Sequence, residues 1–282
     1  MNDSTHSILL IGESGVGKTH YGAQLLSRLA KSENVALKFD LSKGNLNLEP
    51  FQAALEKLND GLAAEHTAST IYLESIWPII DKNGNTLQLL WPDYAGEQVS
   101  MILEQRRVPD RWMKSIRDAS TWLLLIRLNQ HQDHADIFSK PILCAEQNSS
   151  LNDNQCEMSH QARLIELLQI MLFVREINID TSILSPQMAI MLTCWDELPE
   201  NNFPPRQLLE KHMPMFYQYV TSIWKKPLFI GLSALERPLS KESQDEEYIN
   251  NGPESFGYIV NTDGSKSTDL TLPIQLLLNE KI

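Results

Sequence analysis

A glycine-rich segment near the N-terminus carries the most specific chemistry in the chain. Residues 12–19 read GESGVGKT, after the apolar run Ile8–Ile11 and before apolar residues at helical spacing such as Tyr21 and Leu25. A strand that turns through glycines into a helix presents backbone N–H groups, and the positive end of the helix dipole, to a polyanion. The spacing G-x-x-x-x-G-K-T therefore predicts that this loop binds the phosphates of a nucleotide. The alternative, a glycine-rich turn without a ligand, is disfavoured by the flanking strand and helix.

The residues of this phosphate loop have separate predicted roles. Gly12, Gly15 and Gly17 allow the close approach and positive φ that wrapping around phosphate requires. Lys18 is expected to reach the outer phosphates, and the Thr19 hydroxyl to bind Mg²⁺. The predicted phosphate-binding residues are Gly12, Glu13, Ser14, Gly15, Val16, Gly17, Lys18, Thr19 and His20.

A second phosphate-side motif follows a predicted β-hairpin. Residues 70–80 and 86–90 are strand-like, and the segment between them contains Asn-Gly, a strong hairpin signal. The second strand leads into WPDYAGE, which includes Asp93 and Gly96. Asp93 can hold Mg²⁺ through water, and the Gly96 N–H can reach a γ-phosphate because no Cβ blocks the approach. An Asp-x-x-Gly sequence is common in turns, but its position after a hairpin and a phosphate loop favours this function.

Two later strands end in polar residues that could recognise a base. Residues 188–192 run into Thr-Cys-Trp-Asp, and residues 228–232 run into Ser-Ala-Leu. In an α/β sheet such strand ends lie at the ligand-binding edge. The Asp196 carboxylate can accept hydrogen bonds from both the ring N–H and the exocyclic amine of guanine, and the alternative for Asp196 is a helix N-cap. The predicted base-binding residues are Thr193, Cys194, Trp195, Asp196, Ser233, Ala234 and Leu235.

The order of these motifs resembles that of the Ras-like, translation-factor-related P-loop GTPases over most of residues 7–235. The long form, with the closing stretch GYIVNTDG at 257–264, is similar to the bacterial double-GTPase families of conflict and defence operons. The resemblance implies GTP or GDP and Mg²⁺ as cofactors. It implies metal ligation by Thr19, Thr70 and Asp93, and catalytic roles for Lys18, Thr70, Gly96 and Glu97. Thr67 is the alternative to Thr70 as the switch threonine.

The sequence departs from that family pattern at two positions. Thr193-Cys194 stands where the usual Asn-Lys pair precedes the guanine-reading Asp, so the Lys stem that covers one face of the base is absent. Glu97 stands where Ras-like proteins carry the glutamine that orients the attacking water. Its charge would sit close to the γ-phosphate, so we expect slow intrinsic hydrolysis unless Gln98 or a partner completes the site.

The chain is expected to form one α/β domain over residues 1–282, with a P-loop NTPase, Ras-like fold. Its sheet should be mostly parallel, with helices on both faces and insertions after the 121–128 strand and after residue 236. We expect a polar insertion at 129–160, an acidic flexible loop at 238–256 and a C-terminal closing segment at 257–282. Two small domains are the alternative for 282 residues with 42% hydrophobic content.

Composition adds a few exclusions. A formal charge of −12 disfavours broad contact with DNA or RNA, and no apolar run approaches the roughly twenty residues of a membrane span. Three cysteines without metal-like spacing, and the lack of a secretory signal, predict a cytoplasmic protein. The basic residues between Arg106 and Arg117 read as the solvated face of an amphipathic helix. Alternatively Arg106 or Arg107 is an internal arginine finger, or this helix is a switch surface for a partner.

Three functional classes remain open at this stage. The first is a slowly hydrolysing GTP switch that engages a protein partner in its GTP state, such as another protein of the same operon. The second is an ATPase or promiscuous NTPase, favoured by the absence of the Lys ahead of Asp196. The third is a nucleotide-binding interaction module with negligible turnover, favoured by Glu97.

Overall fold

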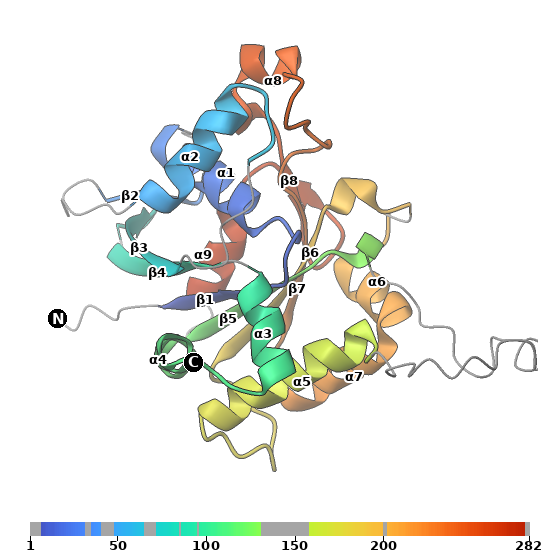
Figure 1. The fold of residues 1–282 in the computed structure, drawn as a ribbon. Coiled ribbons are helices and arrows are strands. Elements are labelled where there is room, and N and C mark those ends of the chain that lie inside the picture. The colour runs from blue at the N-terminus through green and yellow to red at the C-terminus, as the bar shows by residue number, and fades with distance from the viewer. Residues whose placement is uncertain are drawn as a thin grey trace, which may run out of the picture.

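The computed structural model describes residues 7–31, 35–40, 48–64, 72–84, 86–94, 96–130, 158–199 and 202–279. Thr67, Thr70 and most of the expected insertion at 129–160 therefore lie outside the described residues. A six-stranded sheet of order β1-β5-β6-β7-β8-β9 forms the centre of the molecule (Figure 1). A three-stranded sheet, β2-β3-β4, adjoins it through contacts between β4 and β1.

The central sheet is parallel over its first four strands. These are β1 (Ile8–Ile11), β5 (Thr121–Ile126), β6 (Gln187–Thr193) and β7 (Leu228–Ser233). Two short antiparallel strands, β8 (Tyr258–Val260) and β9 (Lys266–Ser267), extend the β7 edge. The predicted mostly parallel sheet is confirmed.

Helices cover both faces of this sheet, as predicted. Alternate strand residues face opposite sides, so Leu124 and Ile190 belong to one core cluster while Leu123 and Ala189 belong to the other. The first cluster includes residues of α3 (Glu97–Gln105), α4 (Asp110–Asp118), α5 (His160–Val174), α6 (Pro205–His212) and α7 (Pro214–Ile223). The second includes residues of α1 (Lys18–Lys31), α2 (Glu49–Asn59) and α9 (Leu272–Asn279). Figure 1 shows α3, α5 and α7 on one side of the sheet and α1 and α2 on the other.

The smaller sheet is antiparallel and contains the predicted hairpin. Its strands are β2 (Leu37–Phe39), β3 (Tyr72–Asp81) and β4 (Thr86–Tyr94). Gly84 has φ +82° in the hairpin turn, a conformation that suits glycine. Because β4 lies beside β1, it leads the chain back to the phosphate loop.

The basic segment 106–117 forms a turn followed by a helix, where a single helix was expected. Arg106 ends α3 in a left-handed conformation with φ +49°, and α4 begins only at Asp110, after Pro109. Trp112 and Ile116 are buried, as the amphipathic pattern predicted. Arg106 and Arg107 therefore lie in the turn after α3, and Arg111, Lys114 and Arg117 lie on α4.

The segment 238–256 was expected to be a loop, and this was wrong in one respect. It contains α8 (Glu246–Asn251), whose N-cap Asp245 accepts a hydrogen bond from the Tyr248 N–H at 3.0 Å. Tyr248 is fully buried and stacks on Phe256, with ring centroids 4.1 Å apart. The polar composition of the segment does not distinguish this short helix from a loop. The closing segment at 257–282 contains β8, β9 and α9.

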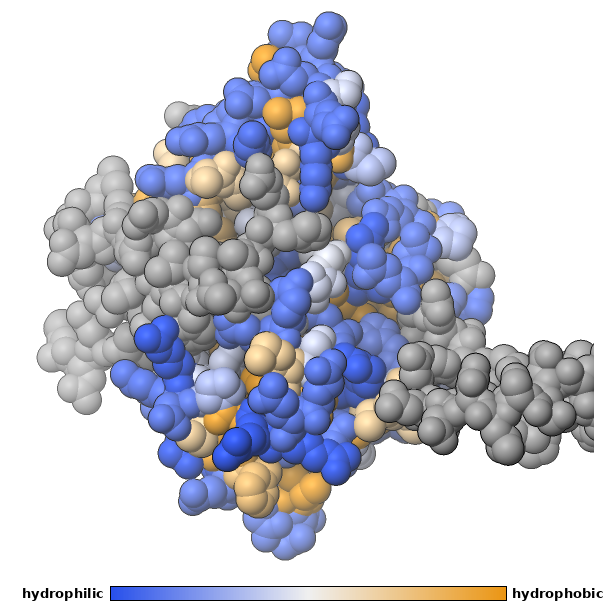
Figure 2. Space-filling view, in the orientation of Figure 1, coloured by the Kyte–Doolittle hydropathy of each residue, from blue (hydrophilic) through white to orange (hydrophobic). Residues whose placement is uncertain are grey.

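The described surface on the side seen in Figure 2 is mainly hydrophilic, with hydrophobic residues in small separate patches. Exposed large apolar residues such as Phe173 and Phe203 are distributed over different elements. In the described part of the chain, no helix is both long enough and apolar enough to cross a membrane.

Gly231 on β7 gives a test of this packing. A Cβ at Gly231 would lie 2.4 Å from the Trp195 ring, which is fully buried. We expect Gly231→Ala to lower the free energy of unfolding by about 1–3 kcal/mol, because the ring or the strand has to move. Urea denaturation measures the change, with exposed Ser222→Ala as the control. An unchanged stability for Gly231→Ala would contradict the contact.

Candidate nucleotide-binding site

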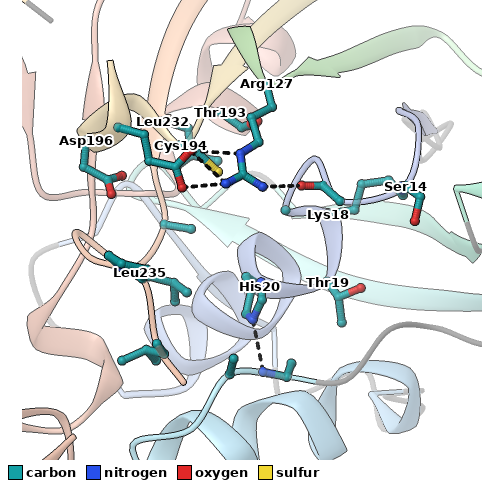
Figure 3. A pocket seen from close by; sticks show the side chains of 18 of the residues that line it. Ser14, Lys18, Thr19, His20, Arg127, Thr193, Cys194, Asp196, Leu232 and Leu235 are labelled. Atoms are coloured by element: carbon teal, nitrogen blue, oxygen red, sulfur yellow. Dashed lines mark hydrogen bonds and ion pairs between the residues drawn. The ribbon is translucent and has the colours of Figure 1, made fainter. Parts of the chain in front are cut away.

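A cavity of about 280 Å³ lies at the carboxyl ends of the parallel strands (Figure 3). The phosphate loop forms one wall, and the segments that follow β6 and β7 form the opposite wall. Predicted site residues that line it are Ser14, Gly15, Gly17, Lys18, Thr19, His20, Gly96, Glu97, Thr193, Cys194, Asp196, Ala234 and Leu235. Residues far apart in the sequence are thus brought together around one cavity.

The phosphate loop joins β1 to α1 and holds its lysine in place. Gly15 and Gly17 have φ values of +77° and +83°, which few other residues adopt readily. The Lys18 Nζ donates to the carbonyl oxygens of Gly12 at 2.9 Å and Glu13 at 2.7 Å. Only 8% of Lys18 is exposed. Its ammonium group is therefore already positioned beside the cavity.

The Glu13 side chain does not line the cavity, although Glu13 was predicted to bind nucleotide. Its carboxylate contacts two α5 side chains instead, with His160 Nε2 at 3.0 Å and Arg163 Nη2 at 2.9 Å. The hydrogen bond with His160 is the main cause that lowers the pKa of Glu13 to about 2, and Arg163 adds to it against the opposing effect of burial. Glu13 therefore fastens the phosphate loop to α5.

The second phosphate-side motif packs directly on the loop. A Cβ at Gly96 would lie only 2.0 Å from the Ser14 nitrogen, so this approach requires glycine. Glu97, the first residue of α3, accepts a hydrogen bond from the Ser14 hydroxyl at 3.1 Å. Asp93 pairs with Leu73 in the hairpin ladder. Its backbone is placed in β4 beside the phosphate loop.

At the other end of the cavity, Asp196 is oriented by Ser233. The Ser233 hydroxyl accepts from the Glu236 N–H at 3.0 Å and donates to Asp196 Oδ1 at 2.5 Å. Ser233 is fully buried and does not line the cavity, whereas Asp196 does. Ser233 was predicted to bind nucleotide directly, but its geometry is that of a residue that positions Asp196.

Three more residues that were predicted to bind nucleotide face the protein interior. Trp195 packs on Gly231, Val16 belongs to the core cluster beside α1, and Gly12 approaches Val16 and Leu125. Cys194 does line the cavity, and burial raises the pKa of its thiol to about 11. The thiol is therefore protonated at neutral pH and offers the cavity a largely apolar surface.

Several other residues that line the cavity belong to none of the predicted motifs. Arg127 lies within the strand predicted at 121–128, whose other residues are mostly apolar. Leu232 of β7 and Glu197 also line the cavity. The remaining residues come from two segments without a recognised motif and are Ala63, Ala64, Arg237, Pro238, Leu239 and Lys241. Ala64 contacts the phosphate-loop helix, because its N–H donates to His20 Nε2 at 3.1 Å.

The proposed metal ligands are hydroxyl and carboxylate oxygens, the chemistry that Mg²⁺ prefers. Thr19 lines the cavity next to Lys18. Among the described residues, no group of three or more His, Cys, Asp or Glu could hold a metal by itself. Mg²⁺ commonly takes one or two protein ligands together with substrate phosphates and waters, so these residues fit such a site.

Neither Arg106 nor Arg107 lines the cavity. The Arg106 Nε donates to Glu166 Oε1 on α5 at 2.9 Å, and 73% of the arginine side chain is exposed. The geometry therefore gives no support to an internal arginine finger at Arg106.

The phosphate loop between β1 and α1, on a mostly parallel sheet covered on both faces, defines a Ras-like P-loop GTPase fold. The sequence model of the Double-GTPase 1 family matches residues 9–277. The chain therefore belongs to the Double-GTPase 1 family, and guanine-nucleotide binding is the property that this family implies. Among curated proteins, no sequence matches the chain.

Several solved structures are similar to it at low identity. The bacterial selenocysteine-specific elongation factor EF-Sec is 15% identical over 82% of this chain, with a TM-score of 0.35, and the chain spans only 26% of that protein. The Arl6 BBS3 small GTPase from Trypanosoma brucei is 10% identical over 89% of this chain and 99% of its own, with a TM-score of 0.38. A signal recognition particle receptor SRb-GTP/SRX complex from Chaetomium thermophilum is 13% identical over 88% and 98%, with a TM-score of 0.40.

The Glu13 contacts predict a pH-dependent contribution to stability. We expect Glu13→Gln to lower the free energy of unfolding at pH 7 by about 1–3 kcal/mol, because Arg163 and His160 lose a charged acceptor. Since the folded-state pKa is about 2 and the ordinary value is 4.5, this contribution is complete above 4.5 and is lost as pH falls from there towards 2. Urea denaturation of both proteins from pH 7 to 2 measures it. A stability difference that does not change over this range would contradict the assignment.

Proposed function

We propose that this chain is a Mg²⁺-dependent GTP switch that hydrolyses GTP slowly by itself and engages a protein partner in its GTP state. One observation carries the proposal most directly. Asp196, held by Ser233, faces the same cavity as Lys18. A carboxylate that can accept two hydrogen bonds from guanine is thus placed opposite a cation that can bind phosphate (Figure 3).

The phosphate end of the cavity supports triphosphate binding. The loop backbone and Lys18 would hold the phosphates, and the Gly96 N–H would meet the terminal one. Thr19, Thr70 and Asp93 would hold Mg²⁺, which neutralises charge on the phosphates when bound. These residue roles are proposed from their order in the sequence and, for Lys18, Thr19 and Gly96, from their place at the cavity.

Slow turnover is proposed from Glu97. Its carboxylate lines the cavity and is bonded to Ser14 of the phosphate loop. An anionic side chain at that position would repel the γ-phosphate and the negative charge that its equatorial oxygens carry in the transition state. The same observation favours the second candidate, a nucleotide-binding module with negligible turnover, which a single-turnover hydrolysis assay would identify.

The partner and its setting form the last part of the proposal. A partner that reads the switch must bind the GTP and GDP forms with different affinity, since equal affinity transmits nothing. The bacterial conflict or defence setting, with a partner encoded in the same operon, rests on the family resemblance alone. Pull-downs with each nucleotide form would test it, and binding that is equal for both forms would count against a switch.

Asp196→Asn tests the base assignment. Because the Ser233 hydroxyl must donate to the side-chain oxygen at position 196, the new amide nitrogen would face the cavity. We expect GTP affinity to fall by on the order of 1–3 kcal/mol and xanthosine triphosphate to bind better than it does to the native protein. Competition binding measures both, with Lys18→Ala as a control that weakens all triphosphates alike. Equal losses for GTP and ATP would instead make Asp196 a structural residue.

Glu97→Gln tests the cause of slow hydrolysis. If repulsion of the γ-phosphate dominates, the neutral amide raises the single-turnover rate, whereas the native protein stays well below the roughly 1 s⁻¹ typical of slow enzymes. Glu97 is exposed at the start of α3, so the fold should tolerate the change. A collapse of the rate would show that the carboxylate already positions the water.

A further inference from the structure

Arg127 lies between the two ends of the cavity, directly after β5. Its Nε and Nη2 donate to Glu197 Oε2 and Oε1 at 2.9 and 2.7 Å, a two-pronged contact that only a planar guanidinium can make. Its Nη1 donates to the Gly15 carbonyl of the phosphate loop at 3.3 Å. Figure 3 shows the side chain between that loop and the turn that carries Cys194 and Asp196.

The sheet explains why a side chain is needed here. β5 lies between β1 and β6, and its backbone pairing ends at Ile11↔Leu124 on one side and at Ile126↔Leu192 on the other. Beyond these pairs the phosphate loop and the base-reading turn leave the sheet. Arg127, which comes from the middle strand, bonds to both of them.

This contact differs from an ordinary surface ion pair. The side chains of Arg127 and Glu197 are only 26% and 23% exposed, and the two residues are 70 positions apart in sequence. Such a partly buried, two-pronged pair fixes geometry better than an exposed pair does. Glu197 also belongs to the same 3₁₀ turn as Asp196, which spans Trp195–Glu197. A displacement of Glu197 therefore displaces the carboxylate expected to read the base.

We propose that Arg127 is a positioning residue that sets the place of Asp196 relative to the phosphate loop and so determines guanine specificity. The chain lacks the Asn-Lys pair ahead of Asp196, and Arg127 supplies a charged link at this end of the cavity. The inference rests on the proposed function, because it takes Asp196 as the guanine acceptor.

Inosine triphosphate separates positioning from direct contact. It lacks the exocyclic amine of guanine, so it can make one of the two expected hydrogen bonds to Asp196. When Arg127→Ala releases the turn, GTP should lose affinity by about 10-fold, while inosine triphosphate should lose less, so that their affinity ratio falls several-fold. Arg127→Lys keeps the charge but not the two-pronged geometry, and it should restore the ratio only in part.

A double-mutant cycle completes the experiment on the full-length chain. If Arg127 and Glu197 act together, Glu197→Ala should change the ratio of GTP affinity to inosine triphosphate affinity only a little in a protein that already carries Arg127→Ala. Arg106→Ala is the matched control, because it removes an arginine with a 2.9 Å carboxylate partner that does not line the cavity. It should leave both affinities unchanged. Circular dichroism checks folding, and Arg127→Lys with Glu197→Gln carries the test if the alanine variants do not fold.

Two results would overturn the inference while the proposed function stands. One is an equal loss for GTP and inosine triphosphate that persists without Glu197, since Arg127 would then touch the nucleotide itself. The other is an unchanged ratio in every variant. If the native protein shows no preference for GTP over ATP or inosine triphosphate, the proposed function fails and the inference fails with it.

Discussion

The parallel alignment of β1, β5, β6 and β7 is the constraint on which the rest of the molecule depends. Parallel strands bring their carboxyl ends to one edge, so the segments that follow four separate strands meet around a single cavity. The alternation of apolar residues along these strands fills a core on each face. Helices on both faces thus stabilise the sheet whose edge forms the cavity. The polar residues at that edge are not required for packing of the core.

Charged side chains beside the cavity hold the segments that follow the strands, where the backbone pairing of the sheet has ended. Glu13 connects the phosphate loop to α5, and Arg127 connects it to the turn after β6. Ser233 does the same for Asp196 with a neutral hydroxyl. In each case the side chain forms a hydrogen bond or ion pair with a residue that lies far away in the sequence. A loop that must approach phosphate closely carries few packing residues, and Val16 is one of them, so hydrogen bonds also hold the loop.

Much of this organisation follows from local sequence. The phosphate loop, the hairpin, the capped helix α5 and the closing helix α9 each have a signal within a few residues, as when Ser159 accepts from the Ala162 N–H. The partners of Glu13 and Arg127 have none, because they lie 150 and 70 positions away. The burial of Tyr248 could not be predicted for a related reason. One buried aromatic in a polar segment gives no periodicity, although its stacking on Phe256 and the Asp245 N-cap both stabilise α8.

The phosphate end of the cavity is linked mechanically to one face of the protein. Gly96 is in close contact with Ser14, and α3 begins at the next residue. α3 in turn contacts α5, since the Arg163 side chain lies 3.5 Å from the Ser100 hydroxyl while it holds Glu13. A ligand that displaces Gly96 must therefore shift α3 relative to the loop, and the contacts with α5 resist that shift. Since α1 and α9 pack on the opposite face of the sheet, a displacement of Gly96 would be transmitted to the α3–α5 side.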